Sequence, residues 1–203
     1  MKVIELLSDD VEQLVLNQLP TAPRTVSPAH VSNIIRDIEN AVLKPGQRRP
    51  YDELSKSERQ RLGTYASVGW AWEDAIRDAL VSSGLHPLSS DRYQPVGQLS
   101  LDGIYGSPDG FDTVDCCVEE FKATWRSSNR PLDPDFWHWL VQIKAYCKML
   151  TVNWARLRVF YVNGNYRESG PQIKQFRLEW SQLEIDDNWK MLRGHAKAKG
   201  WIR

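Results

Sequence analysis

Four short motifs, in a fixed order along the chain, bring together the residue types that metal-assisted phosphodiester hydrolysis requires. They are GWAWE at 69–73, SPDG at 107–110, EFK at 120–122 and QIKAY at 142–146. Carboxylates hold hard divalent cations such as Mg²⁺, which activate water and offset the charge of a phosphate. Each motif is weak alone, so the indication comes from their order, their spacing and the secondary structure expected around them.

The strand expected at 114–125 carries the central acid and the lysine. Because strand side chains alternate between two faces, Glu120 and Lys122 point to the same face. An acid and a lysine on one face are also common on a solvated sheet. Here the apolar residues of the strand indicate that both faces are partly covered, and a buried charged pair needs a partner such as a metal ion. Glu119 points the other way, where a surface ion pair would explain it.

A second acid, Asp109, lies in a Pro-Asp-Gly turn just ahead of that strand. Most such sequences are turns and nothing more. In a meander, however, the end of one strand lies beside the next, so Asp109 could reach Glu120 and share a cation with it. Asp102 is a competitor, but Asp102–Gly103 is already explained as a hairpin turn.

The third acid, Glu73, lies within a long helix expected at 57–81, on or near its apolar face. An ion pair with Arg77, four residues further on, is the structural alternative. The functional interpretation is that this helix packs on the sheet and delivers a third carboxylate to the cation.

The residues after the central strand could orient water or hold DNA. Gln142 and Tyr146 are four residues apart and therefore share one face of a helix expected at about 135–150. They could orient the lysine or a water molecule and touch a phosphate or a base. Trp125, just past the strand, could stack on a base, as could Trp137 or Trp139, although most of the nine tryptophans are expected in the core. Arg126 could hold a phosphate, with a solvated loop as the equal alternative.

The element order predicts an α/β fold in which a mixed central sheet is flanked by helices. We expect one domain over 1–203, with a helical N-terminal extension (1–56), a catalytic core (57–180) and a C-terminal helix (181–203). A helix begins after Ser27 as its cap, with Pro28 at its first position. The elements expected in chain order are helices at 1–20, 28–42 and 57–81, strands at 93–101, 104–111 and 114–125, a helix at 135–150, strands at 155–162 and 172–180, and a helix at 183–203.

Composition limits the class of protein without deciding its function. The 26 basic and 26 acidic residues give a formal net charge of zero, so any contact with DNA must be a local one. Three cysteines are too few for a disulfide framework or an iron–sulfur cluster. No apolar run approaches the ~18–20 residues of a membrane span, and the start MKVIELLSDD argues against a secretory signal. We therefore expect a cytoplasmic protein without a membrane partner.

Together, the motifs resemble those of the PD-(D/E)XK nuclease superfamily. The serine and glycine around Pro108–Asp109 are similar to the phage lambda-type exonuclease branch, and GxxxE at 69–73 resembles the first helical motif of that branch. QxxxY at 142–146 is similar to the RecB-like and CRISPR-associated exonuclease branches. The resemblance spans roughly residues 62–162.

The resemblance implies a restriction-endonuclease-like core and the following roles. Asp109 and Glu120 bind one or two Mg²⁺ or Mn²⁺ ions, helped by the backbone carbonyl of Phe121 and by Glu73. Lys122 positions the attacking water and helps to deprotonate it. Gln142 and Tyr146 organise the lysine and the strand that is cut; with Trp125 and Arg126, Tyr146 is a candidate DNA contact.

The implied activity is a metal-dependent DNA exonuclease of phage-type recombination or DNA end processing. The implied partners are DNA, further copies of the chain, and a recombination protein such as a single-strand annealing protein, in a bacterial or phage-infected cell. Two alternatives stay open, a DNA endonuclease of the same fold and a catalytically silent nucleic-acid-binding module. The motifs would be coincidental if the three acids lay too far apart to share an ion.

Overall fold

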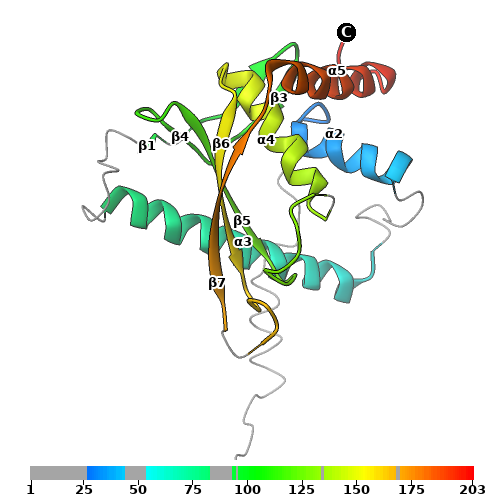
Figure 1. Ribbon diagram of the computed structural model, residues 1–203. Helices are drawn as coiled ribbons and strands as arrows, with labels where there is room; N and C mark the ends of the chain where they lie inside the picture. Colours follow the sequence, from blue (N-terminus) through cyan, green and yellow to red (C-terminus); the bar gives the residue numbers. More distant parts are fainter. Residues whose placement is uncertain (1–26, 44–53, 83–92, 95, 134, 168–169) are drawn as a thin grey trace, which may run out of the picture.

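The computed structural model describes residues 27–43, 54–82, 93–94, 96–133, 135–167 and 170–203. The helix expected at 1–20 lies outside these residues. Within them, an α/β arrangement of two sheets and flanking helices is observed, as the sequence predicts (Figure 1).

A mixed five-stranded sheet, in the order β1-β4-β5-β6-β7, forms the middle of the molecule (Figure 1). β5 and β6 run parallel, and every other neighbouring pair is antiparallel. Parallel neighbours need a long crossover, which the α4 helix (Trp137–Leu150) supplies. The strands are β1 (Tyr93–Gln94), β4 (Gly110–Asp112), β5 (Cys117–Thr124), β6 (Trp154–Tyr161) and β7 (Gln172–Glu179).

A separate hairpin, β2 (Leu99–Leu101) and β3 (Ile104–Gly106), precedes β4. Its turn residues Asp102 and Gly103 have φ values of 52° and 79°, as the two-residue turn predicted from Asp-Gly requires. The predicted strands 93–101 and 104–111 are each interrupted, but the pairs β1–β4 and β2–β3 keep one antiparallel register, and β4 pairs with β5. The expected three-strand meander is therefore observed, with a break within its first hairpin.

Two local features explain where the second of these strands breaks. A Cβ atom on Gly106 would lie 2.8 Å from the Tyr146 ring, so the backbone passes very close to α4 at this point. Pro108 then has no backbone N–H to donate to a ladder. The chain leaves the hairpin between them and pairs again only at Gly110, on the edge of β5.

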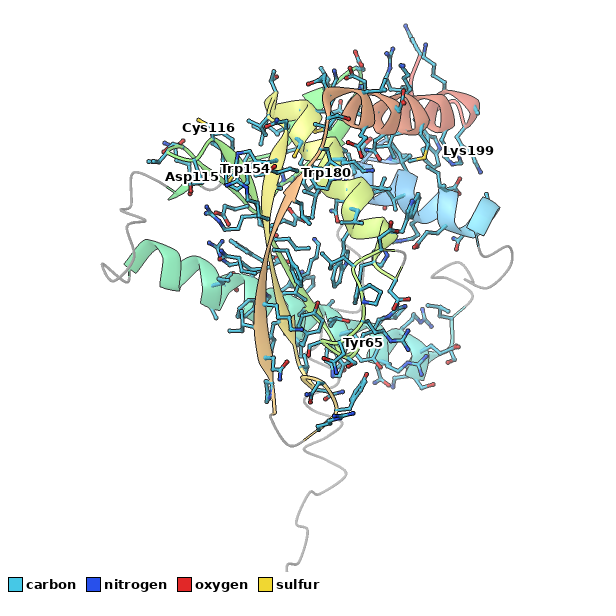
Figure 2. All side chains as sticks on the ribbon, viewed as in Figure 1. Tyr65, Asp115, Cys116, Trp154, Trp180 and Lys199 are labelled. Atoms are coloured by element: carbon cyan, nitrogen blue, oxygen red, sulfur yellow. The ribbon has the colours of Figure 1, made fainter. Side chains whose placement is uncertain are left out.

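The helices cover the two faces of the sheet (Figure 1). α3 (Lys56–Ser82) crosses one face, where Trp72 and Ile76 pack on Phe121 of β5. α2 (Val31–Ile38), which continues as a π-helix (Glu39–Leu43), packs with α4 and α5 (Gln182–Ala198) on the other face. Trp154 and Trp180 lie near one end of the sheet, and Tyr65 of α3 lies near the other end (Figure 2).

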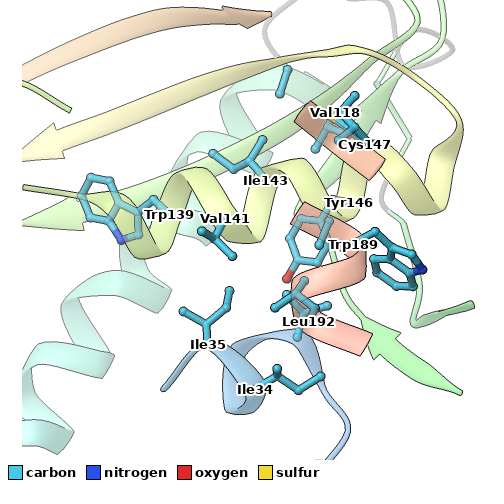
Figure 3. Close-up of a cluster of buried hydrophobic side chains, with 14 of the residues drawn as sticks. Ile34, Ile35, Val118, Trp139, Val141, Ile143, Tyr146, Cys147, Trp189 and Leu192 are labelled. Atoms are coloured by element: carbon cyan, nitrogen blue, oxygen red, sulfur yellow. The ribbon is translucent and has the colours of Figure 1, made fainter. Parts of the chain in front are cut away.

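The main hydrophobic core lies between the sheet and the helices α2, α4 and α5 (Figure 3). α2 contributes to this core although it belongs to the stretch expected as an extension. Members labelled in the figure are Ile34, Ile35, Val118, Trp139, Val141, Ile143, Tyr146, Cys147, Trp189 and Leu192. Among the described residues, no helix combines the length and the apolar character needed to span a membrane.

Side-chain hydrogen bonds to the backbone determine where α5 and α2 begin. α5 begins with a capping box, in which Ser181 and Glu184 each bond the other's backbone N–H. α2 begins at His30, whose Nδ1 accepts from the backbone N–H of Ser32, so the prediction that Ser27 caps this helix is wrong. Ser27 instead forms a preceding turn, in which its carbonyl accepts from the backbone N–H of His30 at 2.9 Å.

Candidate active site

The candidate site lies where β5 leaves its antiparallel neighbour. β4 pairs only with Cys117–Glu119, the first three residues of β5. The turn just before β4 brings Asp109 back to the next part of β5, where its Oδ2 accepts from the backbone N–H of Phe121 at 2.7 Å. The structure thus brings Asp109 to the EFK segment, as predicted.

Glu120 and Lys122 point to the same face of β5, the face of the main core. The Glu120 carboxylate is 1% exposed, and its Oε1 accepts from Lys122 Nζ at 2.5 Å. Its second oxygen, Oε2, is buried without a hydrogen-bond partner among the described residues. An unsatisfied oxygen on a buried carboxylate is costly and needs an explanation.

The charges in this region act strongly on one another. Burial raises the pKa of Glu120, and the neighbouring Asp109 charge raises it further, against the opposite effect of Lys122. Burial alone would lower the pKa of Lys122, but the charges of Glu120, Asp109 and Glu73 outweigh it and raise that pKa. Lys122 therefore stays an ammonium group. Glu73, half-buried on α3, is close enough to act on it.

The Gln/Tyr pair lies beneath the site rather than in it. Gln142 Nε2 donates to the Tyr146 hydroxyl at 2.7 Å, and this confirms that the two share one helix face. Tyr146 is 1% exposed, and burial, followed by the Glu120 charge, raises the pKa of its hydroxyl. A side chain so deeply buried cannot touch DNA, so the expectation of a Tyr146–DNA contact is corrected. Its place beside Glu120 and the Ser107 backbone indicates a positioning role.

The residues after β5 form a partly open surface. The half-buried Trp125 lies against Tyr65 of α3, with ring centroids 4.7 Å apart. The guanidinium group of Arg126 lies over the Phe136 ring, and its Nη1 donates to the Asp135 carbonyl at 2.9 Å. Both candidate DNA contacts are therefore near the surface and held in place.

Of the other two tryptophan candidates, Trp139 is buried against Phe136, with centroids 4.2 Å apart, and cannot stack on a base. Trp137 packs against the main core and is only partly exposed. Tyr65 was not among the residues singled out from the sequence, and its pairing with Trp125 was therefore missed. The available signal was its spacing of eight residues from Glu73, which puts the two on the same side of α3.

A second group of acids occupies the opposite face of β5. Glu119 is fully buried there and accepts from Nη1 of both Arg156 and Arg158, so the predicted surface ion pair is wrong. Arg156 also donates to Asp112 at 3.1 Å and to Asp115 at 2.6 Å. The sequence reasoning missed these arginines, although their alternate positions in a strand of an expected central sheet were the signal.

By distance alone, this second group could also hold a cation. One potential ligand atom from each of Asp112, Cys117 and Glu119 lies within 4.8 Å of the others. The Arg156 guanidinium group, however, already contacts both carboxylates. Positive charge is thus supplied by side chains on this face of β5.

Comparison with known proteins bears on the fold. No protein-family model matches the chain. No curated protein matches it. Among solved structures, the alkaline exonuclease LHK-Exo from Laribacter hongkongensis matches with a TM-score of 0.51 and 15% identity, over 83% of this chain and 86% of that one. A phage related exonuclease from Haemophilus somnus 129PT matches with a TM-score of 0.50 and 13% identity, over 90% and 89% of the two chains. The chain therefore has a fold similar to that of these exonucleases.

Proposed function

We propose that this protein is a metal-dependent DNA exonuclease of the PD-(D/E)XK type. The observation that carries the proposal is the buried Glu120 carboxylate, whose Oε2 has no hydrogen-bond partner among the described residues and which lies beside Asp109 and Lys122. A cation bound by Glu120 and Asp109 would satisfy that oxygen and offset the repulsion between the two acids.

The donor set fits a hard divalent cation. Asp109, Glu120 and Glu73 offer carboxylate oxygens, the backbone of Phe121 offers a carbonyl, and Mg²⁺ and Mn²⁺ prefer such ligands. One or two ions would be held here. A bound cation would supply positive charge to the scissile phosphate and make a water molecule more acidic.

The other residues of the site act through position and charge. The raised pKa of Lys122 keeps it protonated, so it suits hydrogen bonding to the attacking water or to a phosphate oxygen better than removing a proton itself. Tyr146, bonded to Gln142, supports the backbone turn that carries Asp109 and limits the movement of Glu120. Trp125 and Arg126 would contact the DNA.

The fold similarity to an alkaline exonuclease and to a phage related exonuclease supports exonuclease over endonuclease action. Phage-type recombination or DNA end processing in a bacterial or phage-infected cell is the corresponding role. Self-association and an annealing-protein partner belong to the same proposal. A catalytically silent binding module is disfavoured because Asp109, Glu120 and Lys122 are all present and act on one another.

Digestion of labelled DNA tests the proposal. Wild-type protein is incubated with end-labelled linear single- and double-stranded DNA and with closed circular DNA, in Mg²⁺, Mn²⁺ or chelator. We expect nucleotide release from linear DNA only, none with chelator, and none from Lys122→Ala. The surface variant Lys190→Ala, which removes an exposed ammonium group on α5, is the matched control and should digest normally. Cutting of circular DNA would favour the endonuclease, and binding without turnover in any metal would favour the silent module.

A further inference from the structure

An exposed aromatic pair lies just past the candidate active site. Tyr65 of α3 is 46% exposed, and its ring is tilted against that of Trp125 at a centroid distance of 4.7 Å. Leu62, one turn earlier on the same helix, is equally exposed. Large apolar side chains gathered at the surface mark a place where another molecule binds.

The pair is held in position from the side of the sheet. The backbone carbonyl of Trp125 accepts hydrogen bonds from the hydroxyl of Tyr166 and from Asn163 Nδ2, both in the loop between β6 and β7. The hydroxyl of Thr124 accepts from the backbone N–H of Arg126, so the chain on either side of Trp125 is fixed as well. A rigid aromatic surface stacks on a flat partner at little cost in conformational entropy.

The same face of α3 leads from this pair to the acids. Tyr65, Gly69 and Glu73 are spaced at four-residue intervals and therefore lie in one row along the helix. A Cβ atom on Gly69 would meet no described atom within 4 Å, so packing does not explain a glycine there. Glycine in a helix interior is less favourable than alanine. The row is thus an aromatic side chain, an open backbone surface, and a carboxylate of the candidate metal site.

Charge at this end of the sheet suits a nucleic acid strand. Arg126 follows Trp125 directly and its side chain is 46% exposed, and Arg130 is 56% exposed. Both arginines contact the same acid, Asp135. Sites for single-stranded nucleic acid combine aromatic side chains that stack on bases with positive charge along the backbone.

We infer that Tyr65 and Trp125 form a stacking site for an unpaired base of the DNA strand being cut, and that this strand passes over Gly69 to reach the acids. This inference rests on the proposed function for its choice of ligand. Trp125 is three residues beyond Lys122, which is about 10 Å along an extended strand and within reach of a few nucleotides. The site would therefore hold a base near the scissile phosphate, and it favours a single-stranded segment at that position over an intact duplex.

Binding without turnover separates this inference from the proposed activity. A single-stranded oligonucleotide carrying 2-aminopurine is titrated with full-length protein in chelator, and fluorescence quenching reports stacking on an aromatic ring. We expect Tyr65→Leu to lose the quenching and to bind about tenfold more weakly. Tyr65→Phe should retain both, because the ring is kept. Leu183→Ala, which removes an exposed apolar side chain on α5, is the control and should leave both unchanged.

Gly69→Ala gives a second, independent test. Alanine should raise the melting temperature, because it favours the helix, and yet weaken binding of single strands, because a methyl group would then stand in the path of the strand.

If Tyr65→Leu and Gly69→Ala both bind and quench as wild type does, the inference is overturned, whether or not the protein digests DNA. If Tyr65→Leu instead dissociates a wild-type oligomer and leaves DNA binding intact, the pair is a contact between copies, and the inference is equally overturned. If quenching depends on Tyr65 but no metal supports hydrolysis, the stacking site stands and the proposed activity fails.

Discussion

Two neighbouring residues of β5, Glu119 and Glu120, are both buried carboxylates, and they lie in opposite chemical surroundings. Glu119 accepts hydrogen bonds from Arg156 and Arg158, and Arg156 also forms ion pairs with Asp112 and Asp115. Glu120 has one lysine on one oxygen and no described partner on the other. The burial of an acid therefore does not identify a metal site. What distinguishes the two faces is whether side chains already supply the positive charge that the acids need.

The largest expected difference between the two faces is in catalysis. Glu120→Gln should lower kcat/KM for linear DNA by about 10³-fold or more, because it removes an anionic ligand from the proposed cation site. Its melting temperature in chelator should change little, since the amide oxygen still accepts from Lys122. Steady-state kinetics and thermal melts measure both quantities. Normal activity in this variant would contradict the assignment of Glu120.

The next effect is on stability and belongs to the other face. Glu119→Ala leaves two buried guanidinium groups without their shared acid, so the free energy of unfolding should fall by about 3–5 kcal/mol. Denaturant unfolding measures the change. Glu179→Ala on β7 is the matched control, because its acid pairs with Arg177 at the surface and should contribute under about 1 kcal/mol. Equal losses from the two variants would show that the buried network carries no special weight.

Mn²⁺ should stabilise the protein through Asp109 and Glu120, and not through the arginine-paired acids on the other face of β5. Mn²⁺ at about 100 times its dissociation constant should stabilise the wild-type protein by about 2.7 kcal/mol. Asp109→Asn should abolish this stabilisation, whereas Asp115→Asn, in the arginine-paired group, should keep it. Thermal melts with and without Mn²⁺ compare the three proteins. If Asp115→Asn lost the stabilisation by Mn²⁺, the cation would bind at the arginine-paired acids, and the proposed site would be wrong.

The pH should change the apparent affinity for Mn²⁺. Because burial and the Asp109 charge raise the pKa of Glu120 to about 8 in the metal-free protein, a cation that binds at neutral pH must displace a proton from it. The apparent Mn²⁺ affinity should therefore rise as the pH is raised through the neutral range, and it should fall as the carboxyl becomes protonated. Calorimetry in two buffers of different ionisation enthalpy measures the proton released. Binding without proton release at neutral pH would mean that Glu120 is already ionised.

The smallest effect is expected beneath the site. Tyr146→Phe removes the hydroxyl that accepts from Gln142, which should cost about 1 kcal/mol of stability and about tenfold in kcat. The affinity for DNA should not change, because the buried ring does not reach the surface. A weaker affinity with unchanged kcat would instead support the direct DNA contact that the structure argues against.

The sequence predicted most of the local chemistry of the site. Strand alternation placed Glu120 with Lys122, helical spacing placed Gln142 with Tyr146, and Asp-Gly gave the hairpin turn. These predictions succeed because each depends on residues within a few positions of one another. The same reasoning also predicted that Asp109 returns to the EFK strand, because the expected meander pairs the preceding strand with that strand.

The failures have a common cause in contacts between distant segments. Arg156 and Arg158 reach Glu119 from a strand more than thirty residues away, and no local pattern shows that they bury it. The break after Gly106 depends on how closely α4 approaches, and the burial of Tyr146 depends on the same contact. Sequence periodicity shows which face a residue lies on but not which distant segment covers that face.

Anomalous diffraction from crystals soaked in Mn²⁺ tests the central claim most directly, because it shows where a cation binds on β5. The account predicts an anomalous peak at the carboxylates of Asp109 and Glu120 and no peak at Asp112, Cys117 and Glu119. A peak in the arginine-paired group, or an empty site at Glu120 even with DNA bound, would contradict it.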